Sequence, residues 1–482
     1  MARIIIVWGL WSPYHCRRFE VLREHASREG HEMMGVSLFS GSRDYQWISG
    51  RLPEGVRHFD LGKDETKFPL GKLGRLMGIP KKLRTEVALL PSYDHWSLAL
   101  NVASRLAGCR VVMMNDTHAG TARARGIKAA FKQQVVASFH AGLVAGEPQR
   151  RYFASLGMPS DKIFTGYDAV DNDYFAARSD EIRSQAREIR AKYQLPEHYF
   201  LSLGRLVTKK NLATLIKSYR LLLDARPGCQ THLVMVGSGE EEPNLRALCQ
   251  ELHLPIYEKA ELNPGTTDHG PRTMDCKSKT TDNGLRTIEN GLQTTDYALR
   301  TMDHRLGTTD CGTRTTSHET PAKDDRRHTT DQEPGVHFYG FRQIEENPVF
   351  YALADAFILA SLYEEWGLVV NEAMACGLPV VVSATAGCAE DLLVPDRLAA
   401  PPDMSADLRM RLAQLTGHIR QNGFSFNPKS LQSLANALII LEGSPQIRES
   451  MGQASRKIVE RFSCENFATN ALLAARAALN HG

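Results

Sequence analysis

The sequence predicts an α/β protein with two domains, each built on a doubly wound parallel sheet. Short runs rich in Val and Ile alternate with stretches of helical periodicity along the chain, which is typical of parallel βα units. The length of 482 residues, with 42% apolar residues, allows two cores of ordinary size. Residues 266–335 depart from this pattern, because these 70 residues hold many threonines and few apolar side chains. We therefore treat the remaining residues as the folded protein.

The first domain is expected over residues 1–190. Buried strands are predicted at 3–9 (RIIIVWG), 31–39 (HEMMGVSLF) and 109–116 (CRVVMMND), and a helix at 19–30. The first of these runs is too short for a signal peptide, and no stretch reaches the roughly 18 to 20 apolar residues that span a bilayer. We therefore expect a protein that is soluble or at most peripheral, with the cytoplasm as the default location and the inner face of the membrane as the alternative.

The second domain is expected over residues 191–465, after a charged linker or exposed helix at 181–199. Strands are predicted at 199–206, 231–239, 336–341, 355–361 and 378–384, with helices at 212–223, at 243–252 and after Trp366. A last helix within 466–482 could pack back on the first domain. Ligands of such proteins bind beyond the carboxyl ends of the strands, so we expect a cleft between the two domains.

The threonine-rich stretch at 266–335 consists of ten seven-residue units, among them TTDNGLR, TTDYALR and TTDCGTR. A short coiled coil has to be considered, because apolar residues recur at two positions of the unit. Thr, Asp and Gly in each turn oppose a helix, so we favour a disordered insertion in the second domain that carries no chemistry.

Charge and cysteine content exclude some function classes. The net charge of +3 gives no support for nucleic-acid binding. The nine cysteines include no CxxC pair, so neither a disulfide framework nor a zinc site is expected. Residues 1–195 carry 29 basic and 20 acidic side chains, with a dense basic run at 71–84. This domain could contact an anionic membrane surface, or it could simply have a solvated basic face.

The clearest chemical motif is SLYEEWGLVVNEAMACGLPVVVSATAG, residues 361–387. A predicted strand ends before Glu364, and Gly367 lets the backbone approach a ligand closely at the start of a helix. The first amides of that helix, on Gly367, Leu368 and Val369, are expected to bind an anion or sugar hydroxyls. Glu372 lies one turn further along. Two carboxylates beside exposed amides suit a nucleotide sugar.

A second motif, FLSLGRLVTKKNLATLIKSY, covers residues 200–219. It places Arg205 and Lys210 between a strand and a helix, where they could be a basic surface turn or a phosphate site; Lys209 is a weaker candidate than Lys210. Gly237 and Gly239 follow the next strand. A dinucleotide fingerprint would need a third glycine at the position of Glu242, so that interpretation is weak.

The full string around Glu364 and Glu372 resembles the retaining glycosyltransferases of family 4, the group 1 family, whose signature is Glu, seven residues, Glu. Glu365 and Trp366 stand where that family usually has Gly or Pro and Phe. The resemblance implies the GT-B fold, two Rossmann-like domains with a cleft between them. It also implies that a nucleotide-diphosphate sugar is the donor, with no metal cofactor.

The resemblance implies a role for each candidate in the second domain. Glu364 would contact the donor sugar, Glu372 the ribose, and Arg205 and Lys210 the diphosphate. The acceptor would be a carbohydrate, a lipid-linked molecule or a small molecule, in glycan, polysaccharide or glycolipid biosynthesis. The alternatives are a nucleotide-sugar epimerase or phosphorylase of the same fold, or a non-catalytic sugar-nucleotide-binding protein.

The first domain offers candidates for the acceptor side. His118 follows a predicted strand, and the resemblance makes it the first candidate near the reacting carbon, with Asp116 second; a structural histidine is the plainer alternative. Gly9 ends the first strand, and Trp11 and Tyr14 are suited to stacking on an acceptor sugar. Asp171 and Asp173 form a D-x-D pair, which we interpret as a structural turn rather than a metal site.

Overall fold

The computed structural model describes residues 1–41, 52–64, 70–91, 95–122, 126–258, 332–395, 404–415 and 418–480. The predicted repeat insertion at 266–335 falls on residues 259–331 except for its last four positions, so its expected disorder lies outside the described residues. Within the part described, no helix is long and apolar enough to cross a membrane.

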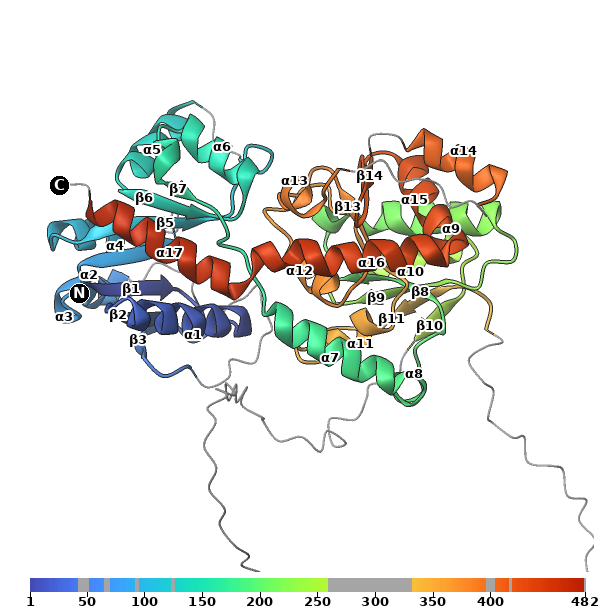
Figure 1. Ribbon diagram of the computed structural model, residues 1–482, viewed down its shortest axis with the longest axis horizontal. Coiled ribbons are helices and arrows are strands. Elements are labelled where there is room, and N and C mark those ends of the chain that lie inside the picture. The colour runs from blue at the N-terminus through green and yellow to red at the C-terminus, as the bar shows by residue number, and fades with distance from the viewer. Residues whose placement is uncertain are drawn as a thin grey trace, which may run out of the picture. The chain divides into compact units, whose positions relative to one another are not determined.

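The first half of the chain forms a seven-stranded sheet in which every neighbouring pair of strands is parallel (Figure 1). The strand order is β3-β2-β1-β4-β5-β6-β7, so the chain changes direction across the sheet between β1 and β4. The strands are β1 (Arg3–Trp8), β2 (Glu32–Phe39), β3 (Val56–Gly62), β4 (Val87–Pro91), β5 (Arg110–Asn115), β6 (Ala141–Val144) and β7 (Ile163–Phe164). The helices of this half are α1 (Pro13–Arg28), α2 (Leu73–Met77), α3 (Ile79–Lys82), α4 (His95–Leu106), α5 (Ile127–Ala137) and α6 (Glu147–Ser155).

The second half forms an eight-stranded sheet in the order β10-β11-β9-β8-β12-β13-β15-β14, parallel except for β14 beside β15. The change of direction lies between β8 and β12. The strands are β8 (Tyr199–Leu203), β9 (His232–Val236), β10 (Ile256–Glu258), β11 (Val336–Phe338), β12 (Ala356–Leu359), β13 (Val380–Ser383), β14 (Ile419–Arg420) and β15 (Gly423–Phe426). The helices are α7 (Asn172–Ser184), α8 (Ala186–Tyr193), α9 (Leu212–Ala225), α10 (Glu242–Glu251), α11 (Asn347–Ala352), α12 (Leu368–Ala375), α13 (Ala389–Leu392), α14 (Ala406–Gln414), α15 (Leu431–Gly443), α16 (Pro445–Val459) and α17 (Cys464–Leu479).

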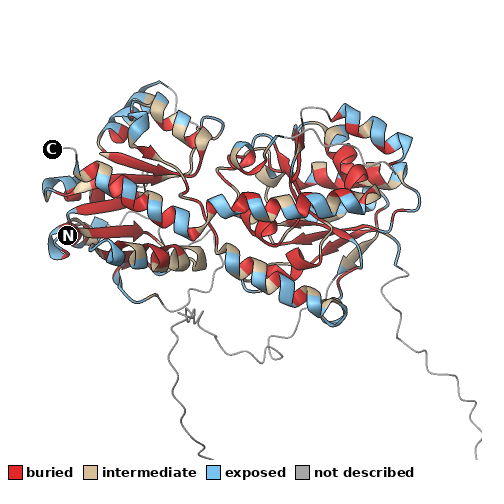
Figure 2. Ribbon diagram, viewed as in Figure 1, coloured by how far each residue is buried: buried red, intermediate tan, exposed pale blue. Residues whose placement is uncertain are grey.

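The predicted α/β class with two parallel sheets is confirmed. Runs of Val and Ile became strands buried on both faces, which Figure 2 shows as red arrows between helices whose outer faces are pale blue. The strands that were not predicted are β3, β4, β6, β7, β10, β14 and β15. The three-residue edge strand β10 gives no apolar run, because it consists of Ile256, Tyr257 and Glu258. The last helix, α17, packs against α1, and Phe467 and Ala471 lie in the same core cluster as Ile4 and Ile6.

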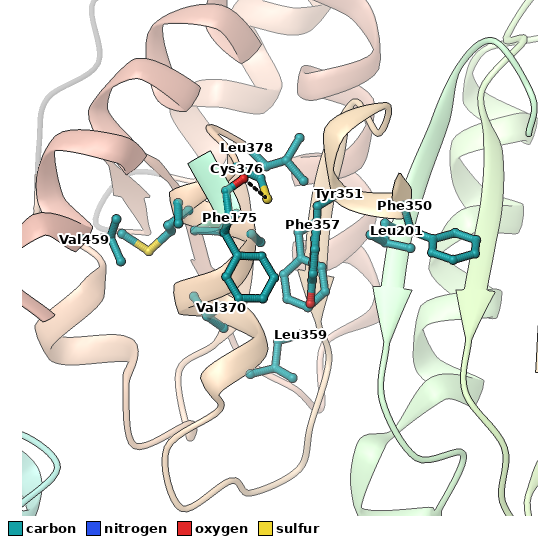
Figure 3. Packing of buried hydrophobic residues seen from close by; sticks show 14 of the residues in the cluster. Phe175, Leu201, Phe350, Tyr351, Phe357, Leu359, Val370, Cys376, Leu378 and Val459 are labelled. Carbon is teal, nitrogen blue, oxygen red and sulfur yellow. Dashed lines mark hydrogen bonds between the residues drawn. The ribbon is translucent and has the colours of Figure 1, made fainter. Parts of the chain in front are cut away.

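A dense hydrophobic core includes residues of α12. Phe175, Tyr351, Phe357 and Val370 are each at most 1% exposed and point toward one another in Figure 3. At the end of α12 the thiol of Cys376 lies 3.6 Å from the carbonyl oxygen of Phe175. Because this core is fully packed, it fixes the helix that carries Glu372.

Candidate active site

The carboxyl ends of β8 and β12 lie at the change of strand direction in the second sheet, where open α/β sheets bind ligands. The turn after β8 is fastened to the end of β12 by Asn211, whose side-chain amide donates to the carbonyl oxygens of Ala360 at 3.1 Å and Pro428 at 2.9 Å. The amide of Leu362 also donates to the carbonyl oxygen of Lys209 at 2.8 Å. These bonds bring the two predicted motifs together.

The side chain of Glu364 is the centre of this arrangement. Its carboxylate is hydrogen-bonded by the ammonium of Lys210, and it accepts from Lys209 at 3.3 Å and from the Ser361 hydroxyl at 3.1 Å. Lys209 also reaches Glu365, at 3.2 Å. The resulting cluster holds two ammonium groups and two carboxylates at the ends of adjacent strands.

The charges of this cluster stabilise one another. Burial of the Glu364 carboxyl raises its pKa, but the neighbouring Lys210 and Lys209 outweigh burial and leave the pKa below its ordinary value. For Lys209, burial lowers the pKa, whereas Glu364 and Glu365 raise it, and the net shift is upward. Glu364 is therefore an ionised acceptor, suited to hydroxyl groups.

The start of α12 presents the backbone amides that the sequence predicted. Gly367 precedes the helix with a φ of +109°, a conformation that side chains rarely adopt, and a Cβ there would lie 3.1 Å from Leu359. No described residue accepts a hydrogen bond from the amides of Gly367, Leu368 or Val369. These amides therefore leave a partial positive charge at the start of the helix, which favours binding of an anion or of a hydroxyl oxygen.

Glu372 lies in the interior, with none of its surface exposed. The hydroxyl of Tyr14 donates to its Oε1, and the amide of Asn347 donates to its Oε2 at 3.4 Å. Burial raises the pKa of Glu372 to about 7, although hydrogen bonds to the carboxylate, including that of Tyr14, oppose the shift. Tyr14, whose ring is expected to stack on an acceptor sugar, thus places its hydroxyl on Glu372.

Residues of the first half contact the loop that carries Glu364. His118 is 8% exposed, and its Nε2 lies 3.0 Å from the carbonyl oxygen of Glu364, while its Nδ1 accepts from the amide of Gly120 at 3.2 Å. The tautomer with hydrogen on Nε2 satisfies both bonds. The buried amide of Gln149 bridges the carbonyl oxygens of Asp116 at 3.1 Å and Glu365 at 2.8 Å.

Asp116 lies beside this bridge. Burial, and then the negative charges of Asp168 and of the two glutamates of the loop, raise the pKa of its carboxyl. Asp168 forms a buried ion pair with Arg18 at 3.5 Å. Neither Asp168 nor Arg18 was singled out from the sequence.

The other candidates occupy different places. Arg205 is an exposed residue just beyond β8. Gly9 is buried and accepts hydrogen bonds from Leu38 at 3.1 Å and Phe39 at 2.9 Å. Gly237 and Gly239 leave room for the turn after β8. A Cβ at Gly237 would lie 1.9 Å from the carbonyl oxygen of Gly204, and a Cβ at Gly239 would lie 2.2 Å from the carbonyl oxygen of Leu206.

Trp11 does not form the stacking surface that was expected from the sequence. The residue is 3% exposed, its indole N–H donates to the carbonyl oxygen of Val36 at 2.9 Å, and its ring lies over Gly35. The ring therefore belongs to the core of the first half, and an aromatic residue near a strand end does not by itself indicate exposure.

The D-x-D pair forms a helix start. Asp171 precedes α7 and accepts from the amide of Tyr174 at 3.2 Å, and it pairs with Arg17 at 3.0 Å. Across the described ranges, no group of three or more His, Cys, Asp or Glu side chains is arranged to hold a metal ion.

Sequence reasoning missed several contacts of the site. Lys209 had been ranked below Lys210, yet both reach Glu364. Gln149, Asn347 and Asn211 act through single side-chain amides, and a lone amide gives no signal in one sequence. The nearest signal of this kind in the sequence is a polar side chain within a mostly apolar helix, such as Asn371 in α12.

Comparison with known proteins gives a consistent result. Residues 185–256 and 323–458 match the family described as glycosyl transferases group 1. A sulfoquinovosyl transferase of Arabidopsis thaliana is 32% identical over 125 residues, 26% of this chain and 20% of that protein. The O-antigen chain mannosyltransferase B of Escherichia coli is 36% identical over 75 residues, 16% of this chain and 20% of that protein. The matched segments thus span about a fifth of these two relatives.

Solved structures share the fold at low sequence identity. A glycosyltransferase from Rickettsia africae superposes with a TM-score of 0.62 at 13% identity, covering 100% of this chain and 99% of that one. HepE of Anabaena, solved in complex with UDP, gives 0.58 at 13% identity, covering 99% and 100%. Both show that the fold is GT-B like.

Proposed function

Because this chain belongs to the group 1 glycosyltransferase family, we propose that it transfers a sugar from a nucleotide-diphosphate sugar to an acceptor hydroxyl with retention of configuration. One observation carries the proposal: Lys209, Lys210 and Glu364 converge beside the amides at the start of α12, at the strand ends where such sheets bind ligands. Cations, a carboxylate and exposed amides together match the diphosphate and the hydroxyls of one donor. The complex of HepE with UDP supports UDP as the first nucleotide to test.

In the proposed reaction the bond between the anomeric carbon and the diphosphate oxygen breaks, and the electron pair stays on the diphosphate. Lys210 and Arg205 stabilise the charge that builds on this leaving group, with Lys209 beside them. Glu364 and the amides of Gly367, Leu368 and Val369 hold the sugar. The acceptor oxygen forms the new bond on the same face, and its proton passes to an oxygen of the leaving diphosphate.

The first half is proposed to hold the acceptor, as domain 1–190 beside a donor domain 191–465. His118 would position the Glu364 loop through the bond from its Nε2 to the carbonyl oxygen. Asp116, whose pKa is raised by burial first, would contact the acceptor hydroxyl. The acceptor would be a carbohydrate, lipid-linked or small molecule of glycan, polysaccharide or glycolipid synthesis.

A basic surface on the first half could bring the enzyme to an anionic membrane. The segment 71–84 remains the candidate, although Lys72 already donates to the carbonyl oxygen of Asp60 at 2.8 Å and Lys82 lies over the ring of Phe59. Flotation with anionic liposomes tests this contact, and binding that survives neutralisation of Lys72, Lys81 and Lys82 would exclude the segment.

A donor screen tests the proposed function. UDP-, GDP-, ADP- and dTDP-linked sugars should be compared by thermal shift, since a bound donor raises the melting temperature by mass action. The donor found should then release nucleoside diphosphate, and Arg205→Ala should reduce kcat/KM by about a hundredfold or more. Product analysis with and without acceptor separates transfer from an epimerase or phosphorylase reaction, and binding without turnover would indicate a non-catalytic protein.

A further inference from the structure

A hydrogen bond joins the first helix of the first half to the second glutamate of the family signature. Tyr14 lies at the start of α1, just beyond the end of β1, and its hydroxyl donates to Oε1 of Glu372 in α12, 358 positions further along the chain. Both residues lie near the point where their sheet changes strand direction. This bond therefore involves the part of each half where a ligand is expected.

Glu372 can meet a ligand only if something that covers it moves, because none of its surface is exposed. Asn347, which donates to Oε2, belongs to α11, and α11 and α12 share one packed core. Moving Asn347 would disturb that core. Tyr14 comes from the other half and only packs against the edge of the core, so it can leave at lower cost.

The other contacts between this loop and the first half use different atoms. His118 and Gln149 bind the backbone carbonyl oxygens of Glu364 and Glu365, which a sugar nucleotide does not need. Tyr14 binds a carboxylate oxygen. Among the described residues of the first half, Tyr14 is the one whose side chain bonds to a side chain that we expect to bind the donor.

We propose that Tyr14 competes with the ribose of the donor for Glu372 and thereby sets the affinity for the nucleotide. This inference rests on the proposed function and on the role that the family resemblance implies for Glu372, which is to bind the ribose of the donor. A phenol and a ribose hydroxyl are both neutral O–H donors, so binding exchanges one hydrogen bond for another of similar strength. The free energy needed to displace Tyr14 then reduces the net binding free energy of the nucleotide.

Titration calorimetry with UDP and with GDP tests the inference. Tyr14→Phe keeps the ring but removes the competing hydroxyl, so the dissociation constant of the nucleotide that the unaltered protein binds should fall by about tenfold. The experiment belongs at about pH 8.5, where Glu372, whose pKa is raised to about 7, is ionised. Tyr152→Phe, on α6 of the same half, serves as a control and should leave the affinity unchanged.

The 2′,3′-dideoxy forms of the same nucleotides identify the group involved. They cannot bond to Glu372, so Tyr14→Phe should improve their binding much less than that of UDP or GDP. Melting temperatures of both variants exclude misfolding, which would weaken binding rather than strengthen it. Unchanged or weaker affinity in Tyr14→Phe, or equal gains for both kinds of nucleotide, would overturn the inference alone. If neither the unaltered protein nor Tyr14→Phe binds UDP or GDP, the titration is repeated with ADP and dTDP, and absence of binding of all four nucleotides would overturn the proposed function as well.

Discussion

Lys210 donates a hydrogen bond to Glu364, and this ion pair joins the turn after β8 to the loop after β12. Both side chains are mostly buried, at 14% and 10% exposure. A donor diphosphate would offer Lys210 a second anion and leave Glu364 to accept from the sugar hydroxyls. The pair therefore links the binding of the leaving group to that of the transferred sugar.

Replacing the two lysines separately should distinguish their roles. Lys210→Ala should lower kcat/KM by about a hundredfold or more, because it removes a cation next to the leaving diphosphate and next to Glu364. Lys209→Ala should have a smaller effect, since Lys209 divides its contacts between Glu364 and Glu365. Steady-state kinetics on both variants measure the difference, and equal losses would contradict the assignment of Lys210 as the principal diphosphate ligand.

The buried carboxyl of Glu372 should make stability depend on pH. Its pKa rises from an ordinary 4.5 to about 7 on folding, first because of burial, so between these values the folded protein holds the proton more tightly than the unfolded chain. Stability from this group therefore falls as pH rises through that window, by about 3 kcal/mol in all. Urea unfolding at pH 5, 6, 7 and 8 measures this effect.

Glu372→Gln is the reference for that series, because its amide stays neutral at every pH. The contributions of the other titrating groups to the free energy of unfolding are the same in both proteins and cancel in the comparison. The unaltered protein should lose stability relative to Glu372→Gln as pH rises. A difference that stays constant from pH 5 to 8 would show that the folded protein does not raise the pKa of Glu372.

Gly387 lies against the loop of the signature, and a side chain there should displace it. A Cβ would lie 1.8 Å from the carbonyl oxygen of Glu365 and 2.7 Å from the amide nitrogen of Gln149. Gly387→Ala should therefore cost about 1 to 3 kcal/mol of stability and reduce turnover. Gly228→Ala, with nothing within 4 Å of its Cβ, is the matched control. Normal melting and turnover in Gly387→Ala would contradict this packing.

Deleting residues 266–335 should leave activity intact, as the repeat composition predicts. The deletion would connect β10 to β11 through the seven residues 259–265, which can extend to about 23 Å, whereas each strand of three residues is about 10 Å long. These parallel neighbours can thus still be joined. Kinetics on the folded deletion variant test this, and loss of turnover would assign the repeat a role.

Sequence patterns predicted many of the buried strands and the principal motifs, because an apolar run or a glycine at a helix start can be recognised within a few consecutive residues. The runs at Ile4 and Val380 indicate strands, and the glycine before Leu368 indicates a helix start. The partners of Glu372 could not be predicted in the same way, since Tyr14 reaches it from the first helix of the chain. Trp11 was misassigned because its exposure depends on Gly35, in a different strand.

The central claim is that Glu364 takes part in sugar transfer from a nucleotide donor. The most direct measurement is the rate of nucleoside diphosphate release from the donor found in the screen, for the unaltered protein, Glu364→Gln and the neighbouring control Glu365→Gln. We predict that Glu364→Gln lowers this rate by about a hundredfold or more, while Glu365→Gln retains most of it. Release at the unaltered rate by a folded Glu364→Gln protein would contradict the account.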